Sequence, residues 1–304
     1  MIGQRAEVRI PSHGEQLAAY RYTPDRAGAS VPCVVMAHGL SATRDDGLPA
    51  YAEAFRDAGC AVILFDYRHF GASTGQPRQL LDIGRQQEDY RAVVDWARKS
   101  PGIDPDRIVL WGSSFSGGHV LVVAAADPRT AAVIAQAPFT DSLPAIRRIP
   151  LANLVRAGAA GLRDRLAAML GRAPVLIPAV GAPGTFAVMT APDADSGFRD
   201  LVGAESLWRN AIAARLVLEL PFYRPVRVAA RLQMPALFCV CDDDTITPPG
   251  STITSAHRAA QGELRRYHYG HFDIYHDPAV KADQVEFLSR VLGEPNWLLP
   301  NVIH

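Results

Sequence analysis

Short apolar runs of strand length, separated by helical segments, constrain this chain more than any other feature of its sequence. A strand that is apolar on both sides is typical of a parallel sheet covered by helices on its two faces. The alternation of such strands with helices therefore predicts an α/β fold with a mostly parallel central sheet and right-handed crossovers. The runs occupy residues 32–37, 61–65, 107–111, 131–136 and 236–240.

The segments between these runs have helical spacing and end at helix-stopping residues. Residues 47–58 end at Gly59, and the amphipathic stretch 83–100 is followed by Pro101 and Gly102, which favour helix termination. The other elements we expect are a two-stranded hairpin turning at Gly14, a helix from the end of the third run to Ala126, helices over 251–261 and 278–292, and a last strand over 264–269.

The alternation is interrupted between about residues 140 and 230. This stretch is rich in Ala, Arg and Pro, and its apolar residues have helical spacing over 151–170 and 208–220. An insertion between consecutive strands of one sheet lies over the carboxyl edge of the strands, where α/β proteins bind ligands. A separate tandem domain fits less well, because the strand–helix pattern resumes directly afterwards. We therefore expect a core formed by residues 1–140 and 231–304, with a helical cap formed by residues 141–230.

The charge composition argues against several classes of partner. Lys plus Arg and Asp plus Glu number 31 each, so the formal net charge is zero. A balanced chain lacks the positive field that holds nucleic acid or an anionic membrane, and we expect neither partner. The first ten residues contain no apolar run typical of a signal peptide. No stretch of about 18 apolar residues predicts a membrane span.

The cysteines indicate a reducing compartment. Cys33, Cys239 and Cys241 lie inside strand-like runs, and Cys60 leads into one. We interpret them as buried free thiols of a cytoplasmic protein, since the sequence gives none of them a loop context that would favour disulfides. Cys239 and Cys241 alternate along one strand without a second pair to complete a zinc site. The sequence contains no phosphate-binding loop or nicotinamide fingerprint either, so we expect no cofactor and no metal.

Residues 112–118 read Gly-Ser-Ser-Phe-Ser-Gly-Gly and stand between an apolar strand and a helix. A nucleophile at such a turn adopts a strained backbone conformation, which needs small residues two positions to either side. Gly112 and Ser116 meet this need around Ser114, whereas Ser113 would have a tryptophan two positions before it. The turn therefore predicts Ser114 as a nucleophile. A Gly- and Ser-rich turn without chemistry is the alternative.

An oxyanion in this kind of site needs two backbone donors. One is the N–H after the nucleophile, and the other comes from a loop after an earlier strand. The first donor is then the N–H of Phe115. The second is the N–H of Leu40, because the strand over 32–37 is followed by His-Gly-Leu at residues 38–40. We interpret His38 itself as structural.

A serine hydroxyl needs an adjacent base and an acid that orients it. His271 follows Gly270 just after the final strand, on a loop at the carboxyl edge, whereas His268 lies within that strand. We therefore assign the base to His271. The preceding strand ends in three consecutive carboxylates, which cannot all face one imidazole. Asp244, which a small polar residue follows three positions later, is our choice of acid, with Asp242 and Asp243 at the surface or structuring the loop.

With Ser114, Asp244 and His271 in this order along the sequence, the chain resembles the α/β-hydrolase superfamily from about residue 5 to 292. One departure from the usual G-x-S-x-G is Ser116, which stands where the second Gly belongs. Within the superfamily the chain is similar to the dienelactone hydrolase and dipeptidyl-peptidase-like esterase branches, which often have a helical cap. The matching motifs are His-Gly-Leu at 38–40, Gly-x-Ser-x-Ser-Gly-Gly at 112–118, Asp-x-x-x-Pro at 244–248, Gly-His-Phe at 270–272, and a structural loop with Phe-Asp-Tyr-Arg at 65–68 and Gly-Ala-Ser at 71–73.

The resemblance implies a serine hydrolase acting on a small acyl substrate. Ser114 would attack the carbonyl carbon while His271 takes its proton, Asp244 orients the imidazole, and the amides of Leu40 and Phe115 stabilise the oxyanion. A serine nucleophile argues against dehalogenase and epoxide hydrolase chemistry, which this superfamily performs with a carboxylate. A carboxylic ester or a lactone is the expected substrate. A thioesterase, a C–C bond hydrolase or an acyltransferase would use the same triad.

Two further alternatives are less favoured. A peptidase would need acidic residues to hold the substrate amine, and none is evident. A binding protein with an inactive triad would typically have lost the serine or the histidine.

The predicted cap contains arginines that could bind a substrate carboxylate. They are Arg209, Arg215 and Arg224, and we interpret them as solvated or paired with acidic residues. Residues 183–186, Pro-Gly-Thr-Phe, indicate a break between cap helices and a hinge. The apolar tail over 297–303 would pack on the domain or on a partner, which leaves a homodimer open.

Overall fold

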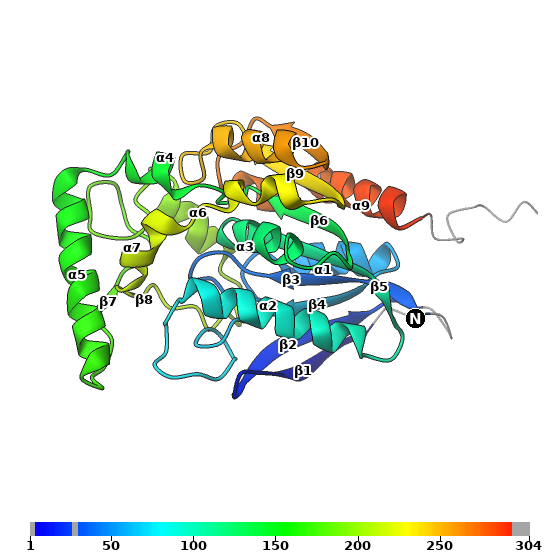
Figure 1. Cartoon of the computed structure of the whole chain (residues 1–304), viewed down its shortest axis with the longest axis horizontal. Coiled ribbons are helices and arrows are strands. Elements are labelled where there is room, and N and C mark those ends of the chain that lie inside the picture. Colours follow the sequence, from blue (N-terminus) through cyan, green and yellow to red (C-terminus); the bar gives the residue numbers. More distant parts are fainter. Residues whose placement is uncertain (1–3, 26–29, 294–304) are drawn as a thin grey trace, which may run out of the picture.

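The computed structural model describes residues 4–25 and 30–293, and a twisted eight-stranded sheet forms its centre (Figure 1). The strand order is β1-β2-β4-β3-β5-β6-β9-β10. The β1–β2 and β2–β4 pairs are antiparallel, and the other five pairs of neighbours in this order are parallel. The predicted mostly parallel α/β architecture is confirmed. The strands are β1 (Gln4–Ser12), β2 (Glu15–Thr23), β3 (Val31–Ala37), β4 (Ala61–Phe65), β5 (Ile103–Ser113), β6 (Thr130–Gln136), β9 (Pro235–Cys241) and β10 (Gln261–Tyr267).

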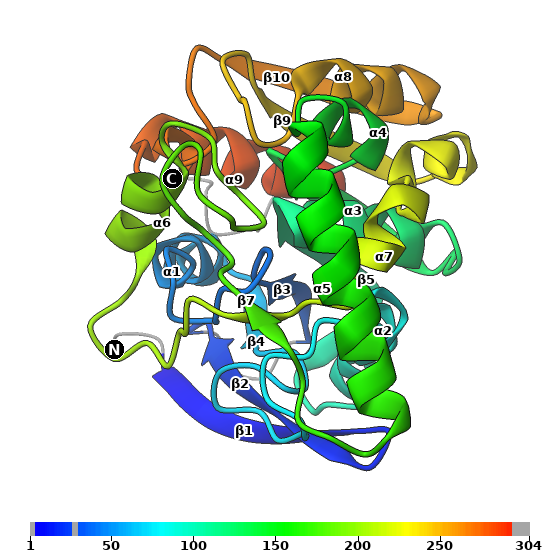
Figure 2. The ribbon, with the colours of Figure 1, turned by 90° about the vertical axis from the view of Figure 1, so that its left-hand side faces the viewer.

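Helices cover both faces of the sheet (Figure 2). Helices α2, α3 and α8 pack on one face, and α1 and α9 pack on the other. Helix α9 and strand β4 have the predicted bounds, and the other core elements differ from prediction by a few residues at their ends. The core helices are α1 (Pro49–Asp57), α2 (Ile83–Arg98), α3 (Phe115–Ala124), α8 (Pro249–Arg258) and α9 (Pro278–Leu292).

Strand β3 shows why the predicted strands are continuously apolar, because every one of its residues is buried. Successive side chains of a strand point to opposite faces. Cys33 and Val35 accordingly pack in the core under α2 and α3. Val34 and Met36 pack in the second core, under α1 and α9. A central strand between two helical layers therefore has no position for a polar side chain.

The segment inserted between β6 and β9 contains less helix than we predicted. Helix α5 (Leu151–Met169) forms over the first helix-spaced stretch, but the second contains only the short α7 (Leu216–Glu219). Ahead of α7, the two-residue strands β7 (Leu176–Ile177) and β8 (Ile212–Ala213) pair with each other. The remaining elements are α4 (Ser142–Ile146), α6 (Ala194–Leu201) and four 3₁₀ turns, η1 (Leu220–Phe222), η2 (Pro225–Arg227), η3 (Ala229–Arg231) and η4 (Asp273–Tyr275), the last of which follows β10.

Tertiary hydrogen bonds explain why residues 208–215 do not form a helix. The Ala213 N–H donates to the Gln79 carbonyl, and the Ala214 N–H donates to the Val175 carbonyl. The Gln79 side-chain amide also donates to the Ala211 carbonyl at 3.0 Å. Partners distant in sequence thus satisfy the backbone hydrogen-bonding groups of an extended segment. The helical spacing of its apolar residues could not reveal these partners.

A buried ion pair joins the loop after β4 to helix α2. Arg68 Nε donates to Asp89 Oδ1 at 2.7 Å, and the Arg68 backbone N–H donates to Asp89 Oδ2 at 3.0 Å. Ser12 at the end of β1 donates to the same carboxylate at 2.7 Å. Burial nevertheless raises the pKa of Asp89, although the contacts with Arg68 and Ser12 oppose this shift. The pair therefore joins three elements at one end of the sheet.

We expect Arg68→Met to lower the free energy of unfolding by about 3–5 kcal/mol at neutral pH, because it leaves a buried carboxylate without its cation. Without Arg68 the pKa of Asp89 in the folded state rises further, so the deficit shrinks as pH falls and the carboxylate protonates. Urea denaturation at several pH values measures both effects. Arg290→Met breaks an exposed pair with Glu263 and should change stability by about 0–1 kcal/mol. Equal losses in the two variants would contradict this expectation.

Candidate active site

Ser114 lies at a sharp turn between β5 and α3. Its backbone has φ 57° and ψ −118°, a left-handed conformation that is strained for a residue with a side chain. Two hydrogen bonds hold this conformation: the Ser114 N–H donates to the Gln136 carbonyl at 2.9 Å, and the Phe139 N–H donates to the Ser114 carbonyl at 2.7 Å. The turn thus presents the Ser114 side chain at the carboxyl edge of the sheet.

Close backbone contacts explain the small residues around Ser114. A Cβ atom at Gly112 would lie 2.4 Å from the Ser116 carbonyl oxygen, and one at Gly117 would lie 2.7 Å from a Pro138 side-chain atom. Glycine is therefore required at both positions. Ser116, which replaces the usual glycine, is fully buried and its hydroxyl oxygen accepts a hydrogen bond from Tyr67 at 3.1 Å. The departure from the usual motif is thus accommodated by a specific partner.

The structure brings together the three side chains that the sequence indicated. His271 lies on the loop after β10, and its Nε2 is 2.9 Å from Ser114 Oγ. Its Nδ1 is 2.6 Å from Asp244 Oδ2. Ser114, Asp244 and His271 are each buried. This continuous chain of hydrogen bonds can accept the serine proton on the imidazole while the carboxylate stabilises the resulting charge.

The loop after β9 holds Asp244 in place. The N–H groups of Ile246 and Thr247 donate to Asp244 Oδ1 at 2.8 and 2.7 Å, and Thr247 Oγ1 donates to Oδ2 at 2.6 Å. Burial alone would raise the pKa of Asp244, but His271 and the hydrogen bonds from His271 and Thr247 outweigh it and lower the pKa. The carboxylate is therefore ionised beside the imidazole. The sequence indicated only that residue 247 is small and polar. It could not show the hydrogen bonds of Thr247, because these form only in the folded loop.

Leu40 and Phe115, the two residues predicted to supply backbone donors, both lie next to Ser114. Both line the cavity at Ser114. In the part of the chain that the structure describes, neither backbone N–H donates to another protein group. A Cβ atom at Gly39 would lie 3.1 Å from the Ser114 Cβ, so the loop after β3 passes close to Ser114. Two such amides can stabilise an oxyanion that forms on a carbonyl attacked by Ser114.

His38 and His119 are core residues rather than bases. Burial lowers the pKa of His38 to about 4, and its ring packs edge-on against Tyr67. Burial also lowers the pKa of His119 to about 3, and its two nitrogens contact Gln86 and Tyr223. Both imidazoles are neutral near pH 7, and Gln86 and Tyr223 already occupy the two nitrogens of His119.

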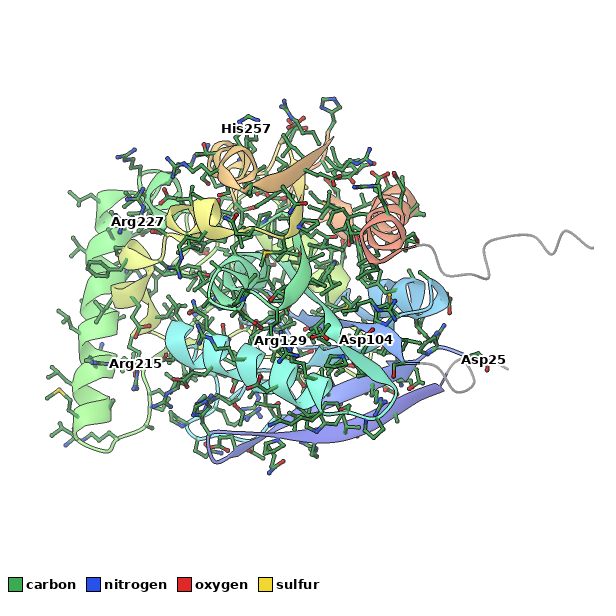
Figure 3. The ribbon with its side chains drawn as sticks, turned by 45° about the vertical axis from the view of Figure 1, so that its right-hand side comes forward. Asp25, Asp104, Arg129, Arg215, Arg227 and His257 are labelled. Carbon is green, nitrogen blue, oxygen red and sulfur yellow. The ribbon has the colours of Figure 1, made fainter. Side chains whose placement is uncertain are left out.

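The other polar candidates lie away from Ser114. The His268 side chain is exposed beside Asp242, which also binds Arg266, and Asp243 is exposed. Arg215 lies beside α5, where it forms an ion pair with Asp164 (Figure 3). The remaining two arginines are Arg224, paired with Asp141, and the exposed Arg209.

A cavity of about 460 Å³ opens next to Ser114. Most of its wall is apolar, and the inserted segment contributes much of it. Arg148 is the one charged side chain that lines it among the described residues, and nothing in the sequence distinguished it from its neighbours. A second hollow of about 20 Å³ lies on the side of His271, next to α6. The larger cavity is lined by Leu40, Ser114, Phe115, Phe139, Ser142, Ala145, Ile146, Arg148, Ile149, Pro150, Val188, Met189, Thr190, Ala191, Pro192, Leu220, Thr245, Ile246 and Thr247.

The described residues contain no group of three or more His, Cys, Asp or Glu side chains arranged to hold a metal ion. Cys33, Cys239 and Cys241 are buried free thiols, and Cys60 is buried. No helix in the described ranges is long and apolar enough to cross a membrane. The apolar tail over 297–303 lies outside the described residues.

Known proteins are similar to this chain in sequence and in fold. The X-Pro dipeptidyl-peptidase (S15 family) model matches residues 13–149. The quorum-quenching protein AidA of Acinetobacter baumannii (strain MDR-ZJ06) is 45% identical over 290 residues, which cover 94% of this chain and 95% of AidA. The chain belongs to the α/β-hydrolase superfamily. Within it, the chain is a member of the serine hydrolases.

Other α/β-hydrolases that resemble the chain have different names. The thiohydrolase aneE of Aspergillus aculeatus is 37% identical over 158 residues, which cover 51% of this chain and 50% of that protein. The crystal structure of the α/β hydrolase GrgF from Penicillium sp. sh18 superposes with a TM-score of 0.79 at 25% identity, covering 94% of this chain and 98% of GrgF. The superfamily expected from the motifs is thus confirmed, while its members differ in the reactions that their names state.

We expect Gly112→Ala to displace the first turn of α3, because the new methyl group would overlap the Ser116 carbonyl. A displacement of about 1 Å at the nucleophile lowers the rate about a hundredfold, and overpacking lowers stability by about 1–3 kcal/mol. Ester turnover and thermal unfolding measure the two effects.

Gly158→Ala in α5 is the matched control. No atom lies within 4 Å of a Cβ at this position. Alanine in a helix interior stabilises by about 0.5–1 kcal/mol relative to glycine, so this variant should keep full activity. Full activity in Gly112→Ala would show that the close contact does not position Ser114.

Proposed function

We propose that this chain hydrolyses a carboxylic ester or lactone of a small, largely apolar substrate through an acyl-enzyme on Ser114. The observation that carries the proposal is the hydrogen-bonded chain Asp244–His271–Ser114, which ends at the wall of an apolar cavity. An isolated serine hydroxyl is a weak nucleophile, and a base oriented by a carboxylate is the arrangement that activates it.

In the proposed reaction, Ser114 Oγ attacks the acyl carbonyl carbon and His271 Nε2 takes the hydroxyl proton. The negative charge that develops on the carbonyl oxygen is stabilised by the amides of Leu40 and Phe115. The protonated His271 then gives its proton to the leaving alcohol oxygen, which departs as the acyl-enzyme forms. A water molecule deprotonated by His271 attacks the acyl-enzyme, and Ser114 recovers its proton as the carboxylic acid leaves.

The inserted segment, residues 141–230, acts as a cap in this proposal. It supplies cavity-lining residues from two stretches, 142–150 and 188–192, among them Ile149 and Met189. Such walls exclude water and select substrates by shape and apolar area. The short loop over 183–186 lies between α5 and α6, and we propose it as a point at which the cap adjusts to different substrates.

The chemistry of the cavity favours an uncharged or anionic acyl substrate over a peptide with a free amine. No acidic side chain lines the larger cavity among the described residues, and its charged side chain is Arg148. A buried ammonium group would need a carboxylate partner. The match to an X-Pro dipeptidyl-peptidase model therefore argues for the shared core fold more than for peptide cleavage.

The names of the relatives favour a second candidate reaction, the cleavage or transfer of a thioester. One relative is named a thiohydrolase and another a polyketide transferase. A thioester presents the same carbonyl to Ser114, so the triad serves both reactions. The quorum-quenching name of AidA adds acylated lactones to the compounds that deserve a test.

We also propose that the chain works in a reducing compartment as a cytoplasmic protein. Cys33, Cys239 and Cys241 are buried free thiols, and burial raises the pKa of each. Such thiols resist oxidation and need no oxidising environment.

A fluorophosphonate probe tests the central claim. The purified protein should form a single adduct on Ser114, located by mass spectrometry, and Ser114→Ala should form none. An unlabelled wild-type protein, or an adduct on another serine, would refute the proposed nucleophile. Turnover of matched oxygen esters, thioesters and acylated lactones with the same acyl chain then separates the two candidate reactions by their kcat/KM values.

We expect Asp244→Asn to lower kcat by about 10⁴, because the amide favours the wrong tautomer of His271. Thr247→Val removes one hydrogen bond to the same carboxylate and should lower kcat less. Single-turnover kinetics with an activated ester measure both. If Thr247→Val matched Asp244→Asn, the orientation of the carboxylate rather than its charge would account for the effect.

A further inference from the structure

Helix α5 presents a continuous apolar stripe to solvent. Its members are spaced four, seven, four and three residues apart, so they lie on one face of the helix. The opposite face packs on the protein, where Gly161 and Asp164 are buried and a Cβ atom at Gly161 would lie 2.8 Å from Val217. The stripe, which we call the α5 stripe, consists of Leu151, Val155, Leu162, Leu166 and Met169.

The exposure of this stripe is unusual within the molecule. Leu151 and Met169 are 76% and 77% exposed, and the three residues between them are more than half exposed. All the exposed large apolar side chains among the described residues belong to the inserted segment. Figure 2 shows α5 running along the side of the molecule that faces the viewer, with no other element in front of it. A contiguous apolar surface of this kind marks an interaction site.

The charged residues on α5 and in the chain next to it are mostly basic. Between Asp141 and Asp193 the sequence contains six arginines and a single acidic residue, Asp164. That carboxylate is buried and paired with Arg215 at 2.7 Å. Zero net charge for the whole chain therefore conceals a local excess of positive charge, and our expectation of no anionic membrane partner rested on the whole-chain count. The six arginines, all exposed, are Arg147, Arg148, Arg156, Arg163, Arg165 and Arg172.

We propose that the α5 stripe and its flanking arginines dock on an anionic lipid surface. A helix with an apolar face bordered by basic residues lies in the interface of a bilayer, with its apolar side chains among the acyl chains. Long arginine side chains reach the headgroups from the border of such a face. The same arginines disfavour a second copy of the chain, because a two-fold contact at α5 would place like charges together, and the one carboxylate between residues 142 and 192, Asp164, is buried.

The position of the stripe connects docking with the active site. Ile149 and Pro150, which immediately precede α5, line the cavity at Ser114, and Leu151 begins the stripe. An apolar acyl substrate dissolved in a bilayer would therefore meet the cavity mouth at the docked surface. This benefit rests on the proposed hydrolysis at Ser114, whereas the docking itself does not.

Co-sedimentation with vesicles tests the docking. The full chain is mixed with vesicles of phosphatidylcholine alone or of phosphatidylcholine with phosphatidylglycerol, at low and at high salt. We expect preferential binding to the anionic vesicles that weakens as salt rises. Ser114→Ala should bind equally well, so a failure of the proposed catalysis would leave the docking result intact.

Paired variants locate the binding surface. The double variant Leu162→Ser/Leu166→Ser should weaken vesicle binding about a hundredfold, and Arg163→Gln/Arg165→Gln should weaken it about tenfold. The matched controls are Leu207→Ser, an exposed leucine outside α5, and Arg129→Gln, an exposed arginine between α3 and β6 (Figure 3). Both controls should bind as the wild type does. Circular dichroism and fluorophosphonate labelling in solution confirm that each variant is folded.

Three results would overturn the proposal. Equal sedimentation of wild type and α5 variants would place lipid binding elsewhere. A wild-type protein that ignores vesicles but forms a dimer by light scattering, which Leu162→Ser/Leu166→Ser dissociates, would assign the stripe to a second copy. A monomer that binds no vesicle would leave the stripe to a protein partner.

Discussion

The left-handed backbone at Ser114 is the constraint on which the rest of the site depends. The Ser114 N–H donates to Gln136 of β6 and the Ser114 carbonyl accepts from Phe139, so the strained turn is held on both sides. Gly112 and Gly117 allow the backbone to pass close to Ser116 and Pro138. The strain is tolerated because a two-sided apolar core fixes β5 and α3 around it. Ser114 is thereby held within hydrogen-bonding distance of an imidazole that arrives from the other end of the chain.

The site combines a rigid core with a more open inserted segment. Asp244 and His271 stand on loops after β9 and β10, and three hydrogen bonds from residues 246 and 247 preorganise the carboxylate. The cavity wall, in contrast, comes largely from short elements between β6 and β9. Chemistry and selectivity are thus placed on different parts of the structure. This division fits a superfamily whose relatives carry names as different as quorum-quenching protein, thiohydrolase and polyketide transferase.

The inserted segment has apolar residues both at the cavity and on the outer surface of the protein. Its apolar residues divide into those that line the cavity, such as Ile149 and Met189, and those that face solvent along α5. The proposed docking of α5 on an anionic lipid surface would unite these two sets around one entrance. It would also explain why six arginines gather between Asp141 and Asp193, where the single carboxylate, Asp164, is already paired with Arg215.

The sequence by itself determined the sheet, its covering helices and the residues 114, 244 and 271, because each depends on local pattern and chain order. Two-sided burial requires continuous apolar strands, and a strained turn requires small neighbours, so both leave a signal in consecutive residues. Only the tertiary structure decided the conformation of residues 208–215, whose backbone partners Gln79 and Val175 are distant in sequence. Tertiary structure likewise decided which arginine lines the cavity, since Arg148, Arg215 and Arg224 differ in their spatial neighbours and not in their local sequence pattern. Contacts between distant segments carry no periodic signal, and for that reason the fold and the meeting of residues 114, 244 and 271 could be predicted while the shape of the pocket could not.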